Sequence, residues 1–460
     1  MNDVSFILPL AKQAIVAPAG HGKTEVIARA SALGRRALVL THTHAGVHVI
    51  KARLKRLGIS PAVAAVDTIA GWATRYAYAF PGRANPPVGV PRGADWNRVY
   101  EGAAAILGSP AVRRVIEASY DRILIDEYQD CDGLQHEIAL GLARILPTVI
   151  FGDPMQGIFE FAPSRIAWHQ TVGPAFPEAG TLDTPHRWRE ANPELGRWIA
   201  DTRQRLMRGD QIDLRDGPIK YRQSDDIFDM GLFFEGLDDR VGSTAAIHCR
   251  RPLCNNLAKA TRGAFQSIEE IAASRLIVFA EAWDAAVSPA DRKRALMALV
   301  ADVLTETTED PEQPDDPMYG SAVQDAWDAL EQSGSEADAI RLLAALRARP
   351  RNRAFRAELL NDARRALAEV ENGRQPLLVD ASQSMRSRLS QTGRAPVKRT
   401  VSTPLLLKGL EFDHVLLPDI THFSREIAAA KLFYVAISRA RLSLTIAAPS
   451  PVIHFAVPNL

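Results

Sequence analysis

A glycine-rich segment between a strand-like run and a helix-like run constrains this chain more than any other feature. Residues 17–24 read APAGHGKT, after the apolar run 13–17 and before the helical pattern 25–33. Such a turn leaves backbone N–H groups and the positive end of the helix dipole free to hold phosphate oxygens. The segment therefore predicts a phosphate-binding loop in an α/β domain, although Ala17 stands where the pattern usually begins with glycine.

The loop also predicts a set of nucleotide ligands. Gly20 and Gly22 allow the backbone to curl around phosphate oxygens. Lys23 carries the charge that reaches the β- and γ-phosphates of ATP, and Thr24 offers a hydroxyl to Mg²⁺. The predicted ATP-binding residues of this segment are Ala19, Gly20, His21, Gly22, Lys23 and Thr24.

A pair of acids follows a second strand-like run. Residues 121–125 (DRILI) lead into DEYQD at 126–130. Adjacent residues at the carboxyl end of a strand can direct both carboxylates into one crevice, where one holds Mg²⁺ and the other activates water. We assign Asp126 to Mg²⁺ and Glu127 to the general base. The two motifs together argue against a chance glycine-rich turn and against simple surface acids.

These motifs and six further segments resemble superfamily 1 DNA helicases of the UvrD/Rep/PcrA type, in the order that this family shows. The six segments are THTH at 41–44, VDTI at 66–69, GDPMQGIF at 152–159, LDTPHR at 182–187, KGLEF at 408–412 and FYVAISRAR at 433–441. In length and motif layout the chain also resembles the helicase-like subunit of the Gabija anti-phage defence system, which partners an OLD-type nuclease.

The resemblance implies an α/β fold with two RecA-like P-loop domains, each a parallel sheet flanked by helices, and small helical insertions. Alternating β-branched runs and helical patterns in the first half independently predict a parallel sheet. A block rich in Ala, Arg, Glu and Leu at 285–375 predicts a helical insertion. The expected domains are 1A at 1–180 with a 1B insertion at about 70–118, 2A at 181–284 and 396–460, and a 2B-like insertion at 285–395.

The resemblance also implies residue roles in ATP hydrolysis. Gln156 matches the glutamine that senses the γ-phosphate, and Arg187 and Arg439 match the two arginines that reach it. His186 stands where the family has a tyrosine that stacks on adenine, and Glu411 matches an acid near the nucleotide sugar. The predicted catalytic residues are Lys23, Glu127, Gln156, Arg187 and Arg439.

For DNA, the resemblance implies bases stacked on aromatic rings. Phe159 and Phe161 are the stacking candidates, and core packing stays an alternative for Phe161. Thr41, Thr43 and Arg250 are candidate contacts to the phosphodiester backbone. Several DNA-side residues depart from the family pattern: Ala70 and Leu405 each replace a histidine, and residues 162–164 lack the usual arginine.

The leading functional interpretation is an ATP-dependent single-stranded DNA translocase or 3′→5′ DNA helicase that uses Mg²⁺ and acts on single-stranded or tailed duplex DNA. A place in an anti-phage complex with an OLD-type nuclease follows from the Gabija likeness. The alternative is a DNA-end- and nucleotide-sensing ATPase subunit that regulates a partner nuclease without processive unwinding.

Composition limits the class of protein and the cellular compartment that we expect. The chain has 460 residues, with 55 Lys and Arg against 54 Asp and Glu, which excludes a histone-like polycation. Only 3 cysteines are present, which argues against a disulfide scaffold. We see neither a signal peptide nor an apolar run that spans a bilayer, so we expect a cytoplasmic protein without membrane partners.

Overall fold

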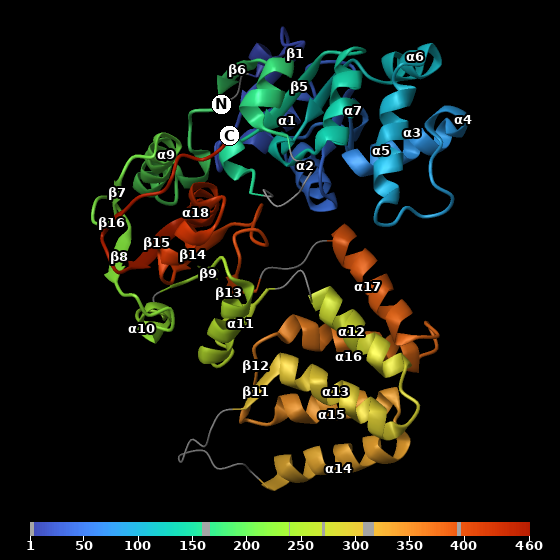
Figure 1. The fold of residues 1–460 in the computed structure, drawn as a ribbon, viewed down its shortest axis with the longest axis vertical. Coiled ribbons are helices and arrows are strands. Elements are labelled where there is room, and N and C mark those ends of the chain that lie inside the picture. The colour runs from blue at the N-terminus through green and yellow to red at the C-terminus, as the bar shows by residue number, and fades with distance from the viewer. Residues whose placement is uncertain (1–3, 159–165, 239, 269–271, 307–316, 393–396) are drawn as a thin grey trace. The chain divides into compact units, whose positions relative to one another are not determined.

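The structure is a computed structural model that describes residues 4–158, 166–238, 240–268, 272–306, 317–392 and 397–460 (Figure 1). Its contacts divide the chain into two compact units. The first unit holds Met1–Asp213, Ser424–Arg441 and Val452–Leu460, and the second holds Leu214–Phe423 and Leu442–Pro451. The expected domain boundaries at 180, 284 and 395 stay a prediction.

The first unit is built on a six-stranded sheet with the order β3-β2-β4-β5-β1-β6. All of its strand pairs are parallel, so the strands end at one common edge. The strands are β1 (Lys12–Val16), β2 (Ala37–Thr41), β3 (Ala64–Thr68), β4 (Arg122–Ile125), β5 (Thr148–Gly152) and β6 (Glu178–Thr181). This order places β5 between β1, which leads into the glycine-rich loop, and β4, which leads into the acids.

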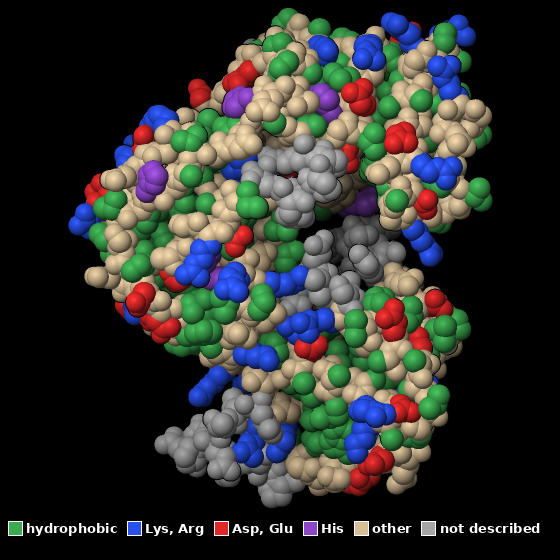
Figure 2. Space-filling model, viewed as in Figure 1, with side chains coloured by type: hydrophobic (Ala, Val, Ile, Leu, Met, Phe, Trp, Pro, Cys, Tyr) green, Lys and Arg blue, Asp and Glu red, His purple; other side chains and the backbone are tan. Residues whose placement is uncertain are grey.

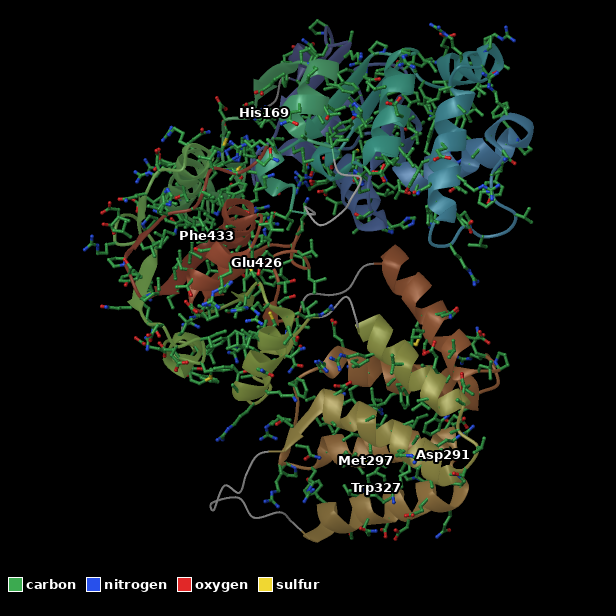
Figure 3. All side chains as sticks on the ribbon, viewed as in Figure 1. His169, Asp291, Met297, Trp327, Glu426 and Phe433 are labelled. Carbon is green, nitrogen blue, oxygen red and sulfur yellow. The ribbon has the colours of Figure 1, made fainter. Side chains whose placement is uncertain are left out.

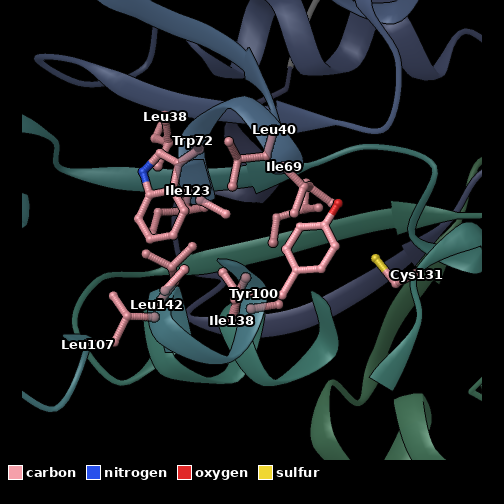
Figure 4. Packing of buried hydrophobic residues seen from close by; sticks show 14 of the residues in the cluster. Leu38, Leu40, Ile69, Trp72, Tyr100, Leu107, Ile123, Cys131, Ile138 and Leu142 are labelled. Atoms are coloured by element: carbon pink, nitrogen blue, oxygen red, sulfur yellow. The ribbon is translucent and has the colours of Figure 1, made fainter. Parts of the chain in front are cut away.

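Helices cover both faces of this sheet. One face packs against α1 (Lys23–Ala30) and α2 (His44–Arg56) through a cluster that includes Val26, Ile50 and Leu54. The other face packs against the helices α3 (Ile69–Ala79), α5 (Asp95–Ile106), α6 (Pro110–Ser119) and α7 (Gly133–Ala143). Figure 4 shows part of this second cluster, in which Trp72, Tyr100 and Ile138 lie close together.

Smaller elements complete the first unit. The helices are α4 (Pro81–Ala84), α8 (Gly173–Ala175), α9 (Pro193–Arg208) and α18 (Ala429–Ile437), and the antiparallel strands are β7 (Ile212–Asp213) and β16 (Val452–Ile453). Phe433 on α18, labelled in Figure 3, packs against Phe455 with ring centroids 5.0 Å apart. This contact ties the chain's last segment to α18.

The second unit contains another six-stranded sheet, with the order β10-β13-β9-β14-β15-β8. Its strands are β8 (Lys220–Gln223), β9 (Thr244–Ile247), β10 (Gln266–Ser267), β13 (Arg399–Ser402), β14 (Phe412–Leu417) and β15 (Ala440–Ala448). The helices α10 (Met230–Phe234) and α11 (Arg251–Ala260) accompany it. The two helix-flanked sheets confirm the predicted α/β class.

The expected helical block forms its own hydrophobic cluster in the second unit. Its helices are α12 (Ala272–Asp284), α13 (Pro289–Val303), α14 (Pro317–Ser333), α15 (Glu336–Ala348), α16 (Ala357–Glu371) and α17 (Leu378–Thr392). The strand β11 (Leu304–Glu306), which follows α13, pairs antiparallel with β12 (Asn352–Ala354), which lies between α15 and α16. The Lys293 ammonium of α13 lies 5.2 Å from the Trp327 ring of α14, a helix that Figure 3 shows beside it.

Basic and acidic side chains are interspersed on the face that Figure 2 shows, so no large patch of one charge sign covers that face. Among the described helices, none has both the length and the apolar character that a membrane crossing requires.

Two histidines whose rings are in contact link β9 to the segment after β14 in the second unit. The rings of His248 and His422 lie 3.7 Å apart between centroids. Each ring accepts a backbone N–H at Nδ1, His248 from Arg250 at 2.9 Å and His422 from Cys249 at 3.3 Å. Burial lowers the pKa of His248 to about 4. The His248 ring is therefore a neutral acceptor near pH 7.

We predict that buried His248 makes the protein less stable in acid. A histidine whose pKa falls on folding binds fewer protons than in the unfolded chain, so stability is lost as the pH falls from about 6.5 towards 4. The loss amounts to about 3 kcal/mol for His248. The His248→Gln variant should lower stability at pH 7 but flatten its pH dependence, measured as urea midpoints between pH 7 and pH 4. His454→Gln, at an exposed histidine, should keep the wild-type slope; equal slopes in all three proteins would contradict the prediction.

Candidate active site

The glycine-rich loop turns sharply between β1 and α1. Gly20 and Gly22 have φ angles of 73° and 84°, which lie in the left-handed region. A Cβ atom at Gly20 would come within 2.6 Å of the Trp188 ring, and one at Gly22 within 3.0 Å of the His186 ring. Both positions therefore require glycine, for conformation and for space.

The loop leaves backbone donors free. Within the described residues, no hydrogen bond is made by the backbone N–H groups of Gly20, Gly22, Lys23 and Thr24. These four groups surround the start of α1, where the helix dipole is positive. An anion with several oxygens, such as a polyphosphate, fits this donor set.

The lysine and the two acids form one charged cluster. The Lys23 ammonium lies 2.8 Å from Asp126 Oδ1 and also contacts Glu127 Oε1. Burial opposes the charge of Lys23, but the two carboxylates outweigh it and raise the pKa of the ammonium. Burial and the neighbouring Glu127 raise the pKa of Asp126. The structure thus brings together the three residues that the two sequence motifs predicted.

Glu127 is held in a defined position. Its backbone adopts a φ of 53°, the left-handed region that few residues other than glycine occupy. Its N–H donates to Asp126 Oδ1 at 2.8 Å, and its Oε2 accepts from the Gln129 amide. The local turn therefore aims the carboxylate towards Lys23 rather than along the strand direction.

A buried aspartate, Asp153, organises the neighbouring segment after β5. Its carboxylate accepts from Arg203 at 2.8 Å and from the Gln156 amide at 3.0 Å. Its own N–H donates to Gln129 Oε1 at 3.0 Å. Gln129 therefore connects Asp153 to Glu127, and Gln156 and Glu127 are held by one continuous set of hydrogen bonds.

Tyr434 of α18 ties the C-terminal part of the unit to the loop. Its hydroxyl accepts the N–H of Ala19 at 3.0 Å. Burial raises the pKa of this hydroxyl, and the charge of Asp153 adds to the effect. The guanidinium of Arg203 lies 5.9 Å from the Tyr434 ring. Segments that are hundreds of residues apart in sequence therefore meet at the glycine-rich loop.

The two predicted arginines lie in this same unit. Arg187 donates its N–H to the carbonyl of Gly20 at 3.0 Å, and its guanidinium donates to the carbonyl of Ser438 at 2.5 Å. Arg439 is fully buried and donates to the carbonyl of Val435 and to the Ser438 hydroxyl, both at 2.9 Å. Their roles at a γ-phosphate stay predictions.

His186 and His21 lie beside the loop as well. His186 belongs to the short 3-10 helix His186–Trp188, and its ring faces Gly22. Burial lowers its pKa, so the ring is neutral at pH 7. His21 is buried, with Nδ1 2.8 Å from the Ala19 carbonyl. His186 therefore occupies a position from which it can contact a bound nucleotide.

The other predicted residues have different surroundings. Thr41 is buried at the end of β2, whereas Thr43 caps α2 by accepting the N–H of Gly46 at 3.0 Å. Arg250 and Glu411 belong to the second unit and are exposed. Phe159 and Phe161 lie outside the described residues. The DNA and nucleotide roles of these residues stay predictions.

Four residues of the hydrogen-bonded set did not enter the predicted site: Gln129, Asp153, Arg203 and Tyr434. Three of them, Gln129, Asp153 and Tyr434, lie inside sequence motifs, beside residues that belong to the predicted site. Arg203 lies in the middle of α9 and belongs to no motif; only the structure identifies it.

Comparison with known proteins supports the resemblance. Residues 91–177 match the family model of the UvrD/REP helicase N-terminal domain, a stretch that includes Asp126, Glu127 and Gln156. This match confirms the resemblance to UvrD-like helicases over these residues. No curated protein matches the chain. The likeness to the Gabija subunit stays a prediction.

Two solved structures are similar at low identity. The crystal structure of Pif1 helicase from Candida albicans has a TM-score of 0.40 and 11% identity, over 96% of this chain and 93% of that chain. The complex of Arterivirus nonstructural protein 10 (helicase) with DNA has a TM-score of 0.27 and 12% identity, over 53% of this chain and 49% of that chain.

The buried ion pair between Arg203 and Asp153 generates a stability prediction. Arg203→Met removes the partner of a carboxylate that is completely buried, so we expect a loss of about 3–5 kcal/mol. Urea unfolding would measure the loss. Arg197→Met on the exposed side of the same helix should change stability by less than about 0.5 kcal/mol. Equal effects of the two substitutions would show that the pair carries no special weight.

Proposed function

We propose that this protein is an ATP hydrolase that translocates on single-stranded DNA and acts as a 3′→5′ DNA helicase. The observation that carries the proposal is the convergence of Lys23, Asp126 and Glu127 beside a glycine-rich loop with free backbone donors. The family match over residues 91–177 supports the same reading, because it covers the acids and Gln156.

The donor set fits ATP with Mg²⁺. The four free N–H groups and Lys23 suit the phosphate oxygens, while Thr24 and Asp126 supply oxygen ligands of the kind that Mg²⁺ prefers. When bound, Mg²⁺ would neutralise charge on the phosphates. We assign the contact with the base to His186, whose ring faces Gly22.

In the proposed reaction Lys23 exchanges partners. Without nucleotide its ammonium is neutralised by Asp126 and Glu127. Phosphate oxygens would replace these carboxylates as its partners, which frees Asp126 for the metal and Glu127 for a water molecule. Glu127 would then accept the proton of the attacking water while Gln129 holds its other oxygen.

Gln156, Arg187 and Arg439 complete the proposed chemistry. Gln156 is held by Asp153, so its amide is positioned before nucleotide binds. Arg187 and Arg439 both contact Ser438, and a movement of this segment would shift both guanidinium groups together. Guanidinium groups at the γ-phosphate stabilise charge that develops in the transition state.

For DNA, the proposal assigns contacts to Thr41, Thr43, Phe159, Phe161 and Arg250. The DNA-side residues that depart from the family pattern weaken the unwinding of duplex DNA. Ala70, which replaces a histidine, is packed against the hydrophobic cluster of the first unit and offers no polar group. This observation favours the second candidate function, an ATPase subunit that senses DNA ends and nucleotide and regulates a partner nuclease.

The ATP-hydrolysis rate against single-stranded DNA length tests the proposal. A translocase takes more steps on a longer strand, so its rate should rise with length to a plateau, whereas an end sensor should respond to the number of ends. We expect length-dependent stimulation but weak displacement of a 3′-tailed duplex, because each base-pair step costs about 1.4 kcal/mol. A rate without DNA dependence would reject both candidates, and robust unwinding would show that the departures are harmless.

Two substitutions separate the roles of the charged cluster. Lys23→Ala should abolish ATP turnover and weaken nucleotide binding, because the phosphates lose their cation. Glu127→Gln should abolish turnover but keep nucleotide binding within about tenfold, because only the base is lost. Binding of a fluorescent ATP analogue and phosphate release would be measured side by side. Equal loss of binding in both variants would reject this division.

A further inference from the structure

A groove of about 710 Å³ lies at the β3 edge of the first sheet, away from the glycine-rich loop. We call it the β3 groove. It is lined by residues 64–67 of β3, by the last two turns of α2 and the connection after it, and by Arg75 of α3. Three strands, β2, β4 and β5, separate β3 from β1. At about 4.8 Å per strand, the groove is about 19 Å from the loop strand.

The groove exposes the backbone edge of β3. Successive residues of the strand point to opposite faces: Ala64 and Val66 pack with the α2 cluster, and Ala65 packs with the α3 cluster. Members of both sets line the groove, so its floor is the outer edge of the strand itself. Within the described residues, β3 pairs with β2 alone.

The walls of the groove are apolar near the strand. Leu54 and Ile59 line the α2 side, and Leu38 of β2 also lines the groove. An extended chain lying on this edge directs alternate side chains to the two faces. Such a chain would find room for apolar side chains on both sides of β3.

The rim of the groove is basic. Lys51 and Lys55 lie one turn apart on α2, are exposed, and form no ion pair within the part of the chain that the structure describes. On the opposite wall Arg75 pairs with Asp67 and is 57% exposed. The four charged side chains leave a net charge of +2, since three are basic and one is acidic.

We propose that the β3 groove binds an extended acidic segment of a partner protein, which adds to the sheet as a seventh strand. Open strand edges pair readily with extended chains, through main-chain hydrogen bonds that give affinity and side-chain pockets that give specificity. The five residues of β3 span about 17 Å, so the bound core is five or six residues long. Apolar residues alternate with Asp or Glu in the segment, and the acids meet Lys51 and Lys55.

Flanking helices make this edge selective. The helices α2 and α3 lie on either side of β3. The edge of another sheet would collide with these helices, whereas a single extended chain fits between them. At the carboxyl end of the strand, the N–H of Thr68 is already taken by the Asp67 carboxylate at 2.8 Å. The open part of the edge is therefore the stretch before Asp67, which lines the same groove as the two lysines.

A displayed library of random 12-residue peptides, selected on the full chain without nucleotide, tests the proposal. We expect enriched peptides that alternate apolar and acidic residues. A synthetic copy of the most enriched peptide should slow hydrogen exchange of the amides in 64–67. Enrichment of basic or helical peptides, absence of enrichment, or binding that leaves these amides unprotected would overturn the proposal.

Matched charge reversals locate the contact. The double variant K51E/K55E should weaken binding of that peptide at least tenfold. The control R114E/R197E changes the same total charge at two exposed arginines elsewhere in the unit and should bind within twofold of wild type. Equal weakening in both variants would reduce the effect to net charge and reject the groove. A concentration-dependent dimer that K51E/K55E dissociates would reject the partner segment in favour of a second copy of this chain.

The outcome is independent of the proposed ATPase activity. Three strands separate β3 from β1, the strand that leads into the loop holding Lys23, so K51E/K55E should keep the wild-type basal ATP-hydrolysis rate. Peptide binding with an inactive ATPase would leave the groove intact and reject the proposed function, and the reverse result would do the opposite.

Discussion

The ion pair between Asp153 and Arg203 is the interaction on which the arrangement of the candidate site depends. A completely buried carboxylate keeps its charge only when cations and donors replace the water it has lost. Here Arg203, the Gln156 amide and the N–H of Met155 provide them. Each of these donors is thereby fixed in turn, and Gln156 is held in one position by Asp153.

The same carboxylate joins parts of the chain that sequence separates widely. Asp153 follows β5, Arg203 lies on α9, and Tyr434 on α18 holds the N–H of Ala19. Through Gln129, Asp153 also reaches Glu127. The release of Lys23 would permit Glu127 to move. Gln129 must then either change its own position or shift Asp153, because it is hydrogen-bonded to both residues. Tight packing favours discrete rearrangements over gradual ones, so these hydrogen bonds offer a physical route between the loop and α18.

The strands and the loop could be predicted because their signals are local. The runs 13–17 and 121–125 became β1 and β4, since buried strands of a parallel sheet are continuous apolar runs. The charged cluster followed from the rule that ligands gather at the carboxyl ends of parallel strands. Arg203 could not be found this way: its partner is 50 residues away, and an arginine on an amphipathic helix normally faces solvent. The position of Thr43, in contrast to that of Arg203, follows from the local sequence. A hydroxyl at the start of a helix accepts a backbone N–H as a cap, whatever else it contacts.

A parallel sheet offers two kinds of boundary, and this protein presents a different chemistry at each. At the carboxyl ends of β1 and β4, backbone donors, a lysine and two acids converge because every strand runs in the same direction. At the lateral boundary, the sheet must stop at a strand whose outer hydrogen-bonding groups have no strand beside them, and here that strand is β3. A chain bound in the β3 groove would extend the sheet without occupying the glycine-rich loop, so the groove and the loop can be filled together.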